Sequence, residues 1–112
     1  MNDKNRASAL VSLIKNIDLA MLDEAQWDAL TAIDVSRRAD LIEVLRNFVK
    51  PEYASWDEAS RRLADDALDA GLADPAYDFA PVLGCVQMPF APVPDPRTFF
   101  LLIRQVLRET AR

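Results

Sequence analysis

The sequence contains no histidine, only one cysteine and only two glycines among its 112 residues. Histidine is the commonest acid–base catalyst and metal ligand, because its charge changes near neutral pH. A single cysteine, Cys85, cannot form a thiolate metal site or a disulfide within the chain. Two separate glycines, Gly71 and Gly84, cannot supply the glycine-rich loop that binds phosphate in many enzymes. We therefore expect no enzyme activity, no cofactor and no metal, and a function in surface recognition.

Acidic residues outnumber basic residues by 18 to 13, so the net charge is −5. A chain of this charge is repelled by nucleic acids and anionic membranes and is attracted to basic partners. No apolar run approaches the roughly 18 residues of a membrane span, and the polar first residues lack the apolar segment of a secretory signal. A single cysteine is also compatible with a reducing compartment. We expect a cytoplasmic protein that binds neither nucleic acid nor membranes.

Hydrophobic residues make up 51% of the chain and charged residues 28%, as is typical of a folded domain. Alanine and leucine are abundant and β-branched residues are few, which favours helices over strands. Apolar residues recur with helical spacing in five stretches, which are residues 3–17, 24–34, 37–49, 56–70 and the segment that begins at Pro96. The sequence predicts one compact all-α domain over residues 1–112, with about five helices.

Two helix starts have strong capping signals. Asp23 is followed three residues later by Gln26, which predicts a capping box in which each side chain binds the other residue's backbone N–H. Asp95 and Pro96 form a favoured pair of N-cap and first helical residue. Trp27, early in the first of these helices, is expected to face the core. The helix that starts at Pro96 is the most hydrophobic segment, and we expect it at the centre of the fold.

The two middle helices have weaker boundary signals. Ser36 and Ser55 are predicted as their caps, Ser55 within a Ser-x-x-Glu capping box that ends at Glu58. The first helix is expected to end before Pro51, since proline cannot donate a helical hydrogen bond. The second is expected to close at Gly71 in the left-handed conformation that ends many helices. Its predicted buried stripe consists mainly of small side chains: Trp56, Ala59, Leu63, Ala67 and Ala70.

Residues 72–95 form a proline-rich arm. Five of the seven prolines lie in this segment, so it cannot form a long helix. Its other residues are largely apolar, whereas a disordered linker would be polar. We therefore expect the arm to lie over the core in an irregular conformation, with a helical turn or a single strand at residues 82–88. A long apolar connection of this kind often has a function.

Acidic side chains are concentrated where basic ones are absent. Between Leu63 and Pro96 there are six aspartates and no lysine or arginine, and the base-free stretch from Asn16 to Ser36 contains five acids. Carboxylates in the first stretch would suit a cationic cleft, such as a nuclease active site, where substrate phosphates otherwise bind. Tyr77 would add an aromatic anchor. We predict a partner-binding surface that consists of Asp65, Asp66, Asp69, Asp74, Tyr77 and Asp78.

Structural roles compete with this interpretation. Asp57 and Glu58 precede a pair of arginines by four residues, and those arginines precede Asp65 and Asp66 by four. This spacing is typical of ion pairs along the solvent face of one helix. Tyr77 could equally anchor the arm to the core. Both interpretations therefore remain open at this point.

Arginines form a stripe on the last predicted helix. Arg97, Arg104 and Arg108 fall within about 40° of one another on a helical wheel. Cations near a helix C-terminus interact favourably with the helix dipole, and the aliphatic part of an arginine side chain covers apolar surface. A structural role is therefore the stronger interpretation. Pairing with the chain's own acidic segment is another role. Contact with nucleic acid or an acidic partner is the remaining alternative, and the net charge opposes nucleic acid.

In size, acidity, helical content and lack of catalytic groups, the whole chain resembles the immunity proteins of bacterial contact-dependent growth inhibition. Those proteins block a toxin domain, often a nuclease, in the cytoplasm of the cell that produces it. The resemblance implies that this chain binds a basic toxin domain and covers its active-site cleft. It rests on no shared motif, so no site residue is carried over from the family.

Two other classes of function remain as alternatives. A helical adaptor or secretion-chaperone-like protein would use the apolar arm to bind a partner peptide or helix. A small enzyme or a regulatory RNA-binding protein would use the arginine stripe. Ionic strength distinguishes these classes. The association rate of an electrostatically steered complex falls as ionic strength rises, whereas binding in an apolar groove is not weakened in this way.

The absence of histidine leads to a prediction about catalysis. The purified chain should show no turnover of nucleic acids, phosphoesters, acyl esters or glycosides. The sequence has no histidine, a single cysteine and no phosphate-binding loop, and nothing marks out a catalytic pair among its many carboxylates. Steady-state assays with each substrate class would measure this. Activity that disappears in the variant Cys85→Ser would contradict the prediction.

Overall fold

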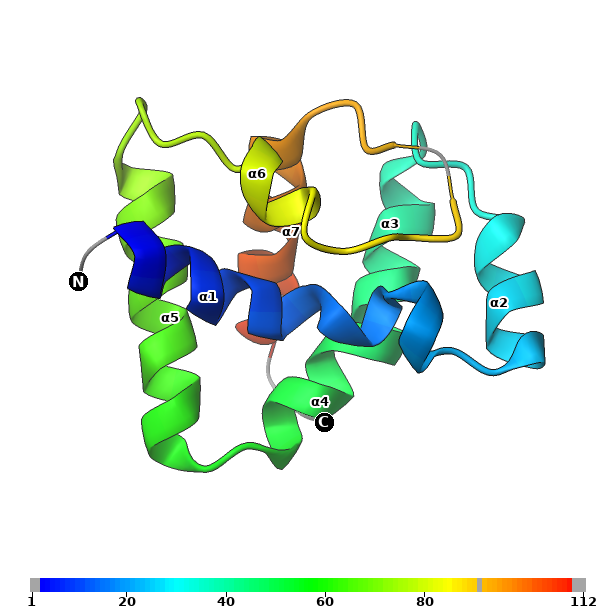
Figure 1. The fold of residues 1–112 in the computed structure, drawn as a ribbon, viewed down its shortest axis with the longest axis horizontal. Coiled ribbons are helices and arrows are strands. Elements are labelled where there is room, and N and C mark those ends of the chain that lie inside the picture. The colour runs from blue at the N-terminus through cyan, green and yellow to red at the C-terminus, as the bar shows by residue number, and fades with distance from the viewer. Residues whose placement is uncertain (1–2, 91, 110–112) are drawn as a thin grey trace.

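All regular elements in the described part of the chain are helical, which confirms the predicted all-α fold. The computed structural model describes residues 3–90 and 92–109, and Figure 1 shows their arrangement. The elements are α1 (Asp3–Ile14), η1 (Lys15–Ile17), η2 (Leu19–Met21), α2 (Glu24–Thr31), α3 (Arg38–Val44), η3 (Leu45–Val49), α4 (Lys50–Ser55), α5 (Glu58–Ala73), α6 (Ala80–Leu83) and α7 (Pro96–Leu107). Of these, η1 and η2 are 3-10 turns and η3 is a π-helical turn.

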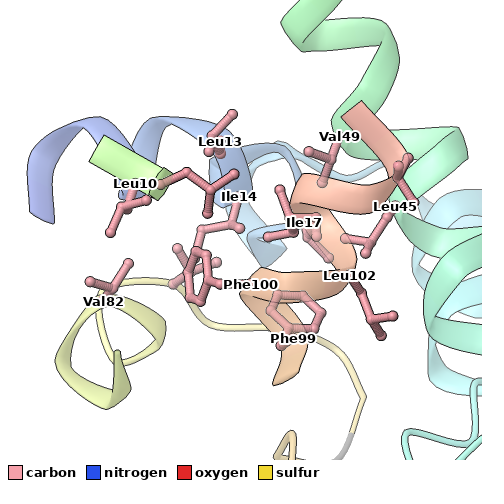
Figure 2. Close-up of a cluster of buried hydrophobic side chains, with 14 of the residues drawn as sticks. Leu10, Leu13, Ile14, Ile17, Leu45, Val49, Val82, Phe99, Phe100 and Leu102 are labelled. Carbon is pink, nitrogen blue, oxygen red and sulfur yellow. The ribbon is translucent and has the colours of Figure 1, made fainter. Parts of the chain in front are cut away.

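The helix α7 lies at the centre of the fold, as predicted. It packs against α3, α5 and η3, while α1 packs against α5 and α6 and crosses in front of α7 in Figure 1. Five of its apolar side chains are buried: Phe99, Phe100, Leu102, Ile103 and Val106. Figure 2 shows side chains of α1, η1, η3 and α6 converging on this helix. Burying a large apolar side chain stabilises a fold by about 1.5–3 kcal/mol, so α7 organises the core.

The cap signals before α2 and α7 are confirmed. The Asp23 carboxylate accepts a hydrogen bond from the Gln26 backbone N–H at 2.8 Å, and the Gln26 side chain accepts one from the Asp23 N–H at 3.0 Å. Asp95 accepts bonds from the hydroxyl of Thr98 at 2.7 Å and from the backbone N–H of Arg97 at 3.1 Å. The hydrogen bonds from Thr98 lower the pKa of Asp95, because they favour its charged form.

The two predicted serine caps are wrong. The residue before α3 is Arg37, and the Ser36 hydroxyl instead donates to Asp34 at 2.6 Å. The N-cap of α5 is Asp57, whose carboxylate accepts from the Ser60 N–H at 2.7 Å, while the Ser55 hydroxyl donates to the carbonyl of Glu52. In each case the serine satisfies a group in the preceding turn, so the helix begins one or two residues later than expected.

The predicted end before Pro51 is also wrong, because the chain remains helical from α3 through α4. The π-helical turn η3 follows α3 directly, and Pro51 then falls in the first turn of α4. A proline is tolerated there, since the first N–H groups of a helix have no intrahelical partner. The π-helical winding at η3 thus allows the chain to stay helical on both sides of Pro51.

Gly71 has a different role from the predicted one. The helix α5 continues through it to Ala73, and no residue in the described ranges has a positive φ. A Cβ atom at this position would lie 3.0 Å from Cζ of Phe79 and 3.3 Å from Cδ2 of Tyr77. Glycine therefore allows two aromatic rings of the arm to pack directly on the backbone of α5.

The buried stripes of α2 and α5 differ from the predicted ones. Trp27 is 37% exposed and Leu63 is 51% exposed, so neither faces the core. On α5 the fully buried residues are Ala64, Ala67, Leu68 and Gly71, a stripe rotated relative to the expected one. Only Ala67 belongs to both sets. The buried side of α5 is the side that packs against α1 and α7, and at Gly71 it also meets the rings of the arm.

The arm begins at Asp74, because α5 extends to Ala73, and it lies over the core as expected. Phe79, Val82, Val86 and Phe90 are all buried. The four-residue helix α6 supplies one helical turn, at Ala80–Leu83, so it begins two residues before the predicted segment 82–88, and residues 84–88 form neither helix nor strand. In Figure 1 the arm passes from the end of α5 across the fold to the start of α7.

Truncation of a central α7 side chain should destabilise the protein strongly. Ile103 has no exposed surface, so Ile103→Ala should lower the free energy of unfolding by about 2–5 kcal/mol, as in other packed cores. Leu101 is the matched control on the same helix, because it is 41% exposed, and Leu101→Ala should change stability by less than about 0.5 kcal/mol. Urea unfolding measures both variants. Equal losses would show that the assigned core face of α7 is wrong.

Candidate partner-binding surface

Two of the predicted surface aspartates are engaged within the fold. Asp65 accepts a hydrogen bond from the Tyr53 hydroxyl, with both carboxylate oxygens 2.9 Å away. Burial and this hydrogen bond raise the pKa of Tyr53 to about 12. Asp69, one helical turn further along α5, lies 2.8 Å from a guanidinium nitrogen of Arg108 and 3.5 Å from one of Arg104. These bases lie far from Asp69 in sequence, and their contacts with it confirm the pairing between the arginine stripe and the acidic segment that the sequence left open.

Three of the predicted aspartates remain exposed without a basic partner. Asp66 makes no hydrogen bond or ion pair with the described residues. Asp74 and Asp78 each accept a hydrogen bond from the backbone N–H two residues further on, at 2.9 Å from Ala76 and 3.0 Å from Ala80. Such bonds are typical of Asx turns, which shape the arm and leave the carboxylate charge accessible. We refer to Asp66, Asp74 and Asp78 as the arm-side acids.

Tyr77 serves mainly as an anchor of the arm. Its ring is half-buried and meets the ring of Phe79 edge-on, with centroids 4.8 Å apart. The guanidinium of Arg6 lies over the same ring, 4.9 Å from its centroid. Its backbone carbonyl accepts a hydrogen bond from Arg97 at 2.9 Å. These contacts favour the structural interpretation that the sequence left open.

Arg97 fastens the arm to both neighbouring helices. From the first turn of α7 its guanidinium donates to the carbonyl oxygens of Leu72 at 3.2 Å, Asp74 at 2.7 Å and Tyr77 at 2.9 Å. It also lies over the ring of Phe79, 5.2 Å from the centroid. Carbonyls at the end of a helix need such donors, and a guanidinium offers several in a fixed geometry. Arg97, the first residue of the arginine stripe, therefore has a structural role.

A second acidic surface lies on α2. Trp27 is 37% exposed and is preceded by Asp23 and Glu24 and followed by Asp28, all of which are exposed. None of these three acids forms an ion pair within the part of the chain that the structure describes. We call these four residues the α2 surface. It combines a large aromatic side chain with three uncompensated negative charges.

The position of α2 in the fold leaves this surface open. Among the described elements, α2 takes part in none of the extensive helix–helix contacts, and Figure 1 places it at the edge of the fold beyond α3. Leu30 is its only fully buried residue. The absence of bases near α2 is visible in the sequence, but the outward position of Trp27 is not. Periodicity alone gave no means of orienting so short a helix.

The described residues contain no candidate metal site and one exposed thiol. They include no group of three His, Cys, Asp or Glu side chains that could hold a metal ion. Cys85 is exposed, and its thiol lies 3.3 Å from the carbonyl oxygen of Pro81, to which it can donate a hydrogen bond. Within residues 3–90 and 92–109, no helix has the length and apolar character needed to cross a membrane.

No protein-family model matches the chain, and no curated protein or solved structure is significantly similar to it. Its function must therefore be inferred from its own surfaces.

Loss of the Arg97 guanidinium should destabilise the fold more than loss of an exposed arginine. Arg97→Met removes the guanidinium bonds to three carbonyl oxygens, of which that of Asp74 keeps another donor, the Tyr77 N–H at 3.1 Å. We expect a loss of about 1.5–3 kcal/mol in the free energy of unfolding. Arg108→Met is the control, because it removes an exposed ion pair worth about 0–1 kcal/mol. Urea unfolding compares the two variants. If Arg97→Met costs no more than the control, Arg97 does not fasten the arm.

Proposed function

We propose that this chain is an immunity protein that binds a basic toxin domain in the cytoplasm and covers its active-site cleft. The observation that carries the proposal is the α2 surface, where an exposed tryptophan is surrounded by three acids without ion-pair partners. Tryptophan is among the side chains most enriched at binding hot spots. A toxin that cleaves nucleic acid presents cations to hold phosphates, and carboxylates are suited to occupy the same positions.

The distribution of charge supports a basic partner. Five acids and no bases lie between Asn16 and Ser36, a local charge equal to the net charge of the whole chain. Uncompensated charges of one sign attract an oppositely charged protein before contact and increase the association rate. The arm-side acids form a second surface with the same sign, which keeps the originally predicted region as a competing location for the interface.

Growth protection tests the proposal. The product of the gene immediately upstream should stop bacterial growth when it is expressed alone, and co-expression of this chain should restore growth. The variants Trp27→Ala and Asp28→Lys should weaken binding of that product at least about thirtyfold each, because hot-spot contacts are worth about 2 kcal/mol or more. Calorimetry with the purified proteins measures the binding loss. A harmless neighbouring product would refute the assignment as its immunity protein.

Matched controls separate the two acidic surfaces. Leu63→Ala removes another exposed apolar side chain from a different helix and should leave binding unchanged. The pair Asp74→Lys and Asp78→Lys reverses two arm-side charges. If that pair abolishes protection while Trp27→Ala and Asp28→Lys do not, the interface lies on the arm side.

A second candidate function has an observation of its own. The arm encloses an apolar groove of about 390 Å³ that no charged side chain lines. Its lining includes Leu83, Val86, Met88, Phe90 and Val93. Such a groove supports the alternative of a helical adaptor or secretion-chaperone-like protein that binds a peptide or helix. Binding that does not weaken as ionic strength rises would favour this alternative, because apolar contacts are not screened by salt.

A further inference from the structure

The outer side of α7 carries a cationic hollow that the acidic surfaces do not explain. Thr98, Leu101, Gln105 and Arg108 are exposed and follow one another at helical spacing along this side of the helix. They border a hollow of about 360 Å³ whose remaining lining is Arg38, Leu102 and Arg104. Among the described residues, the lining thus contains three guanidinium groups and no carboxylate.

These guanidinium groups are held in place by neighbouring side chains. Arg38 reaches across from α3 and donates to Oε1 of Gln105 at 2.9 Å. Arg104 and Arg108 lie 3.5 Å and 2.8 Å from the same carboxylate oxygen of Asp69, which approaches from α5. Fixed donors lose less conformational entropy when they bind a ligand than mobile ones do. The hollow is therefore preorganised by bonds between three helices.

The charges at the hollow are only partly neutralised. Asp69 compensates one of the three positive charges, and the partner of Arg38 is a neutral amide oxygen. A concentration of uncompensated positive charge is unexpected in a chain whose net charge is −5. A planar guanidinium offers paired N–H donors whose geometry matches the oxygens of phosphate and carboxylate groups.

We propose that this hollow binds the phosphate group of a small molecule, with Arg38, Arg104 and Arg108 as its donors. The volume lies in the range of small-molecule sites, and Leu101 and Leu102 offer apolar contact to the rest of the ligand. A nucleic acid is disfavoured as the ligand, because its many phosphates would be repelled by the unpaired acids of the same chain. This inference is independent of the proposed partner on α2.

A titration of the full-length chain with inorganic phosphate and with pyrophosphate tests the site. Amide NMR signals of residues 98–108 should shift and saturate, whereas sodium chloride at matched ionic strength should produce no saturating shift. Arg38→Gln and Arg104→Gln should each weaken pyrophosphate binding about tenfold, as expected for a charge-assisted hydrogen bond. Arg62→Gln is the control, because Arg62 pairs only with Glu58 on the exposed side of α5.

Two further variants distinguish binding from a purely structural role of the arginines. Asp69→Asn removes the negative charge that competes for Arg104 and Arg108 but keeps an amide oxygen that can accept their hydrogen bonds. The arginines should therefore stay in place, and pyrophosphate binding should strengthen about two- to fivefold. Leu101→Glu places a carboxylate at the exposed rim without removing a native bond, and it should abolish binding while the circular dichroism spectrum stays unchanged. Unsaturated shifts, equal affinity in Arg38→Gln and the unmodified chain, or weaker binding in Asp69→Asn would each overturn the proposal. Tighter binding of a short RNA than of pyrophosphate would overturn the small-molecule assignment.

Discussion

The ring of Phe79 joins three parts of the fold: α5, the arm and α7. It stacks on Phe100 with ring centroids 4.8 Å apart, meets Tyr77 edge-on, and lies beneath the guanidinium of Arg97. Its edge reaches the backbone of α5 because Gly71 has no side chain. Without this ring, the apolar side of α7 that faces the arm would lose its cover. Phe79 therefore connects the arm to the buried side of α5 at Gly71 and to α7 at Phe100.

The fold separates the charged residues into neutralised and accessible groups. Near α7, arginines bind carbonyl oxygens of the arm and the carboxylate of Asp69, so this acid of α5 is compensated. On the α2 surface, Asp23, Glu24 and Asp28 form no ion pair with the described residues, although the Asp23 carboxylate also caps the helix. A surface of this kind suits a basic protein, while the hollow that Arg38 borders suits an anion. The two surfaces lie on different helices, so both can be occupied independently.

Local signals predicted part of the fold correctly. The capping box of Asp23 and the cap at Asp95 depend on hydrogen bonds within three residues, so composition and spacing are sufficient to identify them. The predicted serine caps were wrong because nearby residues offered competing hydrogen bonds. At α5 the carboxylate of Asp57, only two residues after Ser55, caps the helix instead. The outward orientation of Trp27 was missed because an eight-residue helix with one buried side chain has no clear apolar stripe.

The sequence by itself determined that the chain is helical and acidic, that it lacks histidine, and that an apolar arm precedes the central helix. These properties follow from composition and from preferences that act over one or two turns. Only the tertiary structure decided which charges are neutralised, because the pairs are distant in the chain: Arg108 lies 39 residues from Asp69, and Arg38 lies 67 residues from Gln105. Such contacts form only after the packing of α3, α5 and α7 has placed their outer faces side by side. For the same reason, the exposed surface of α2 and the cationic hollow could be located only in the folded chain.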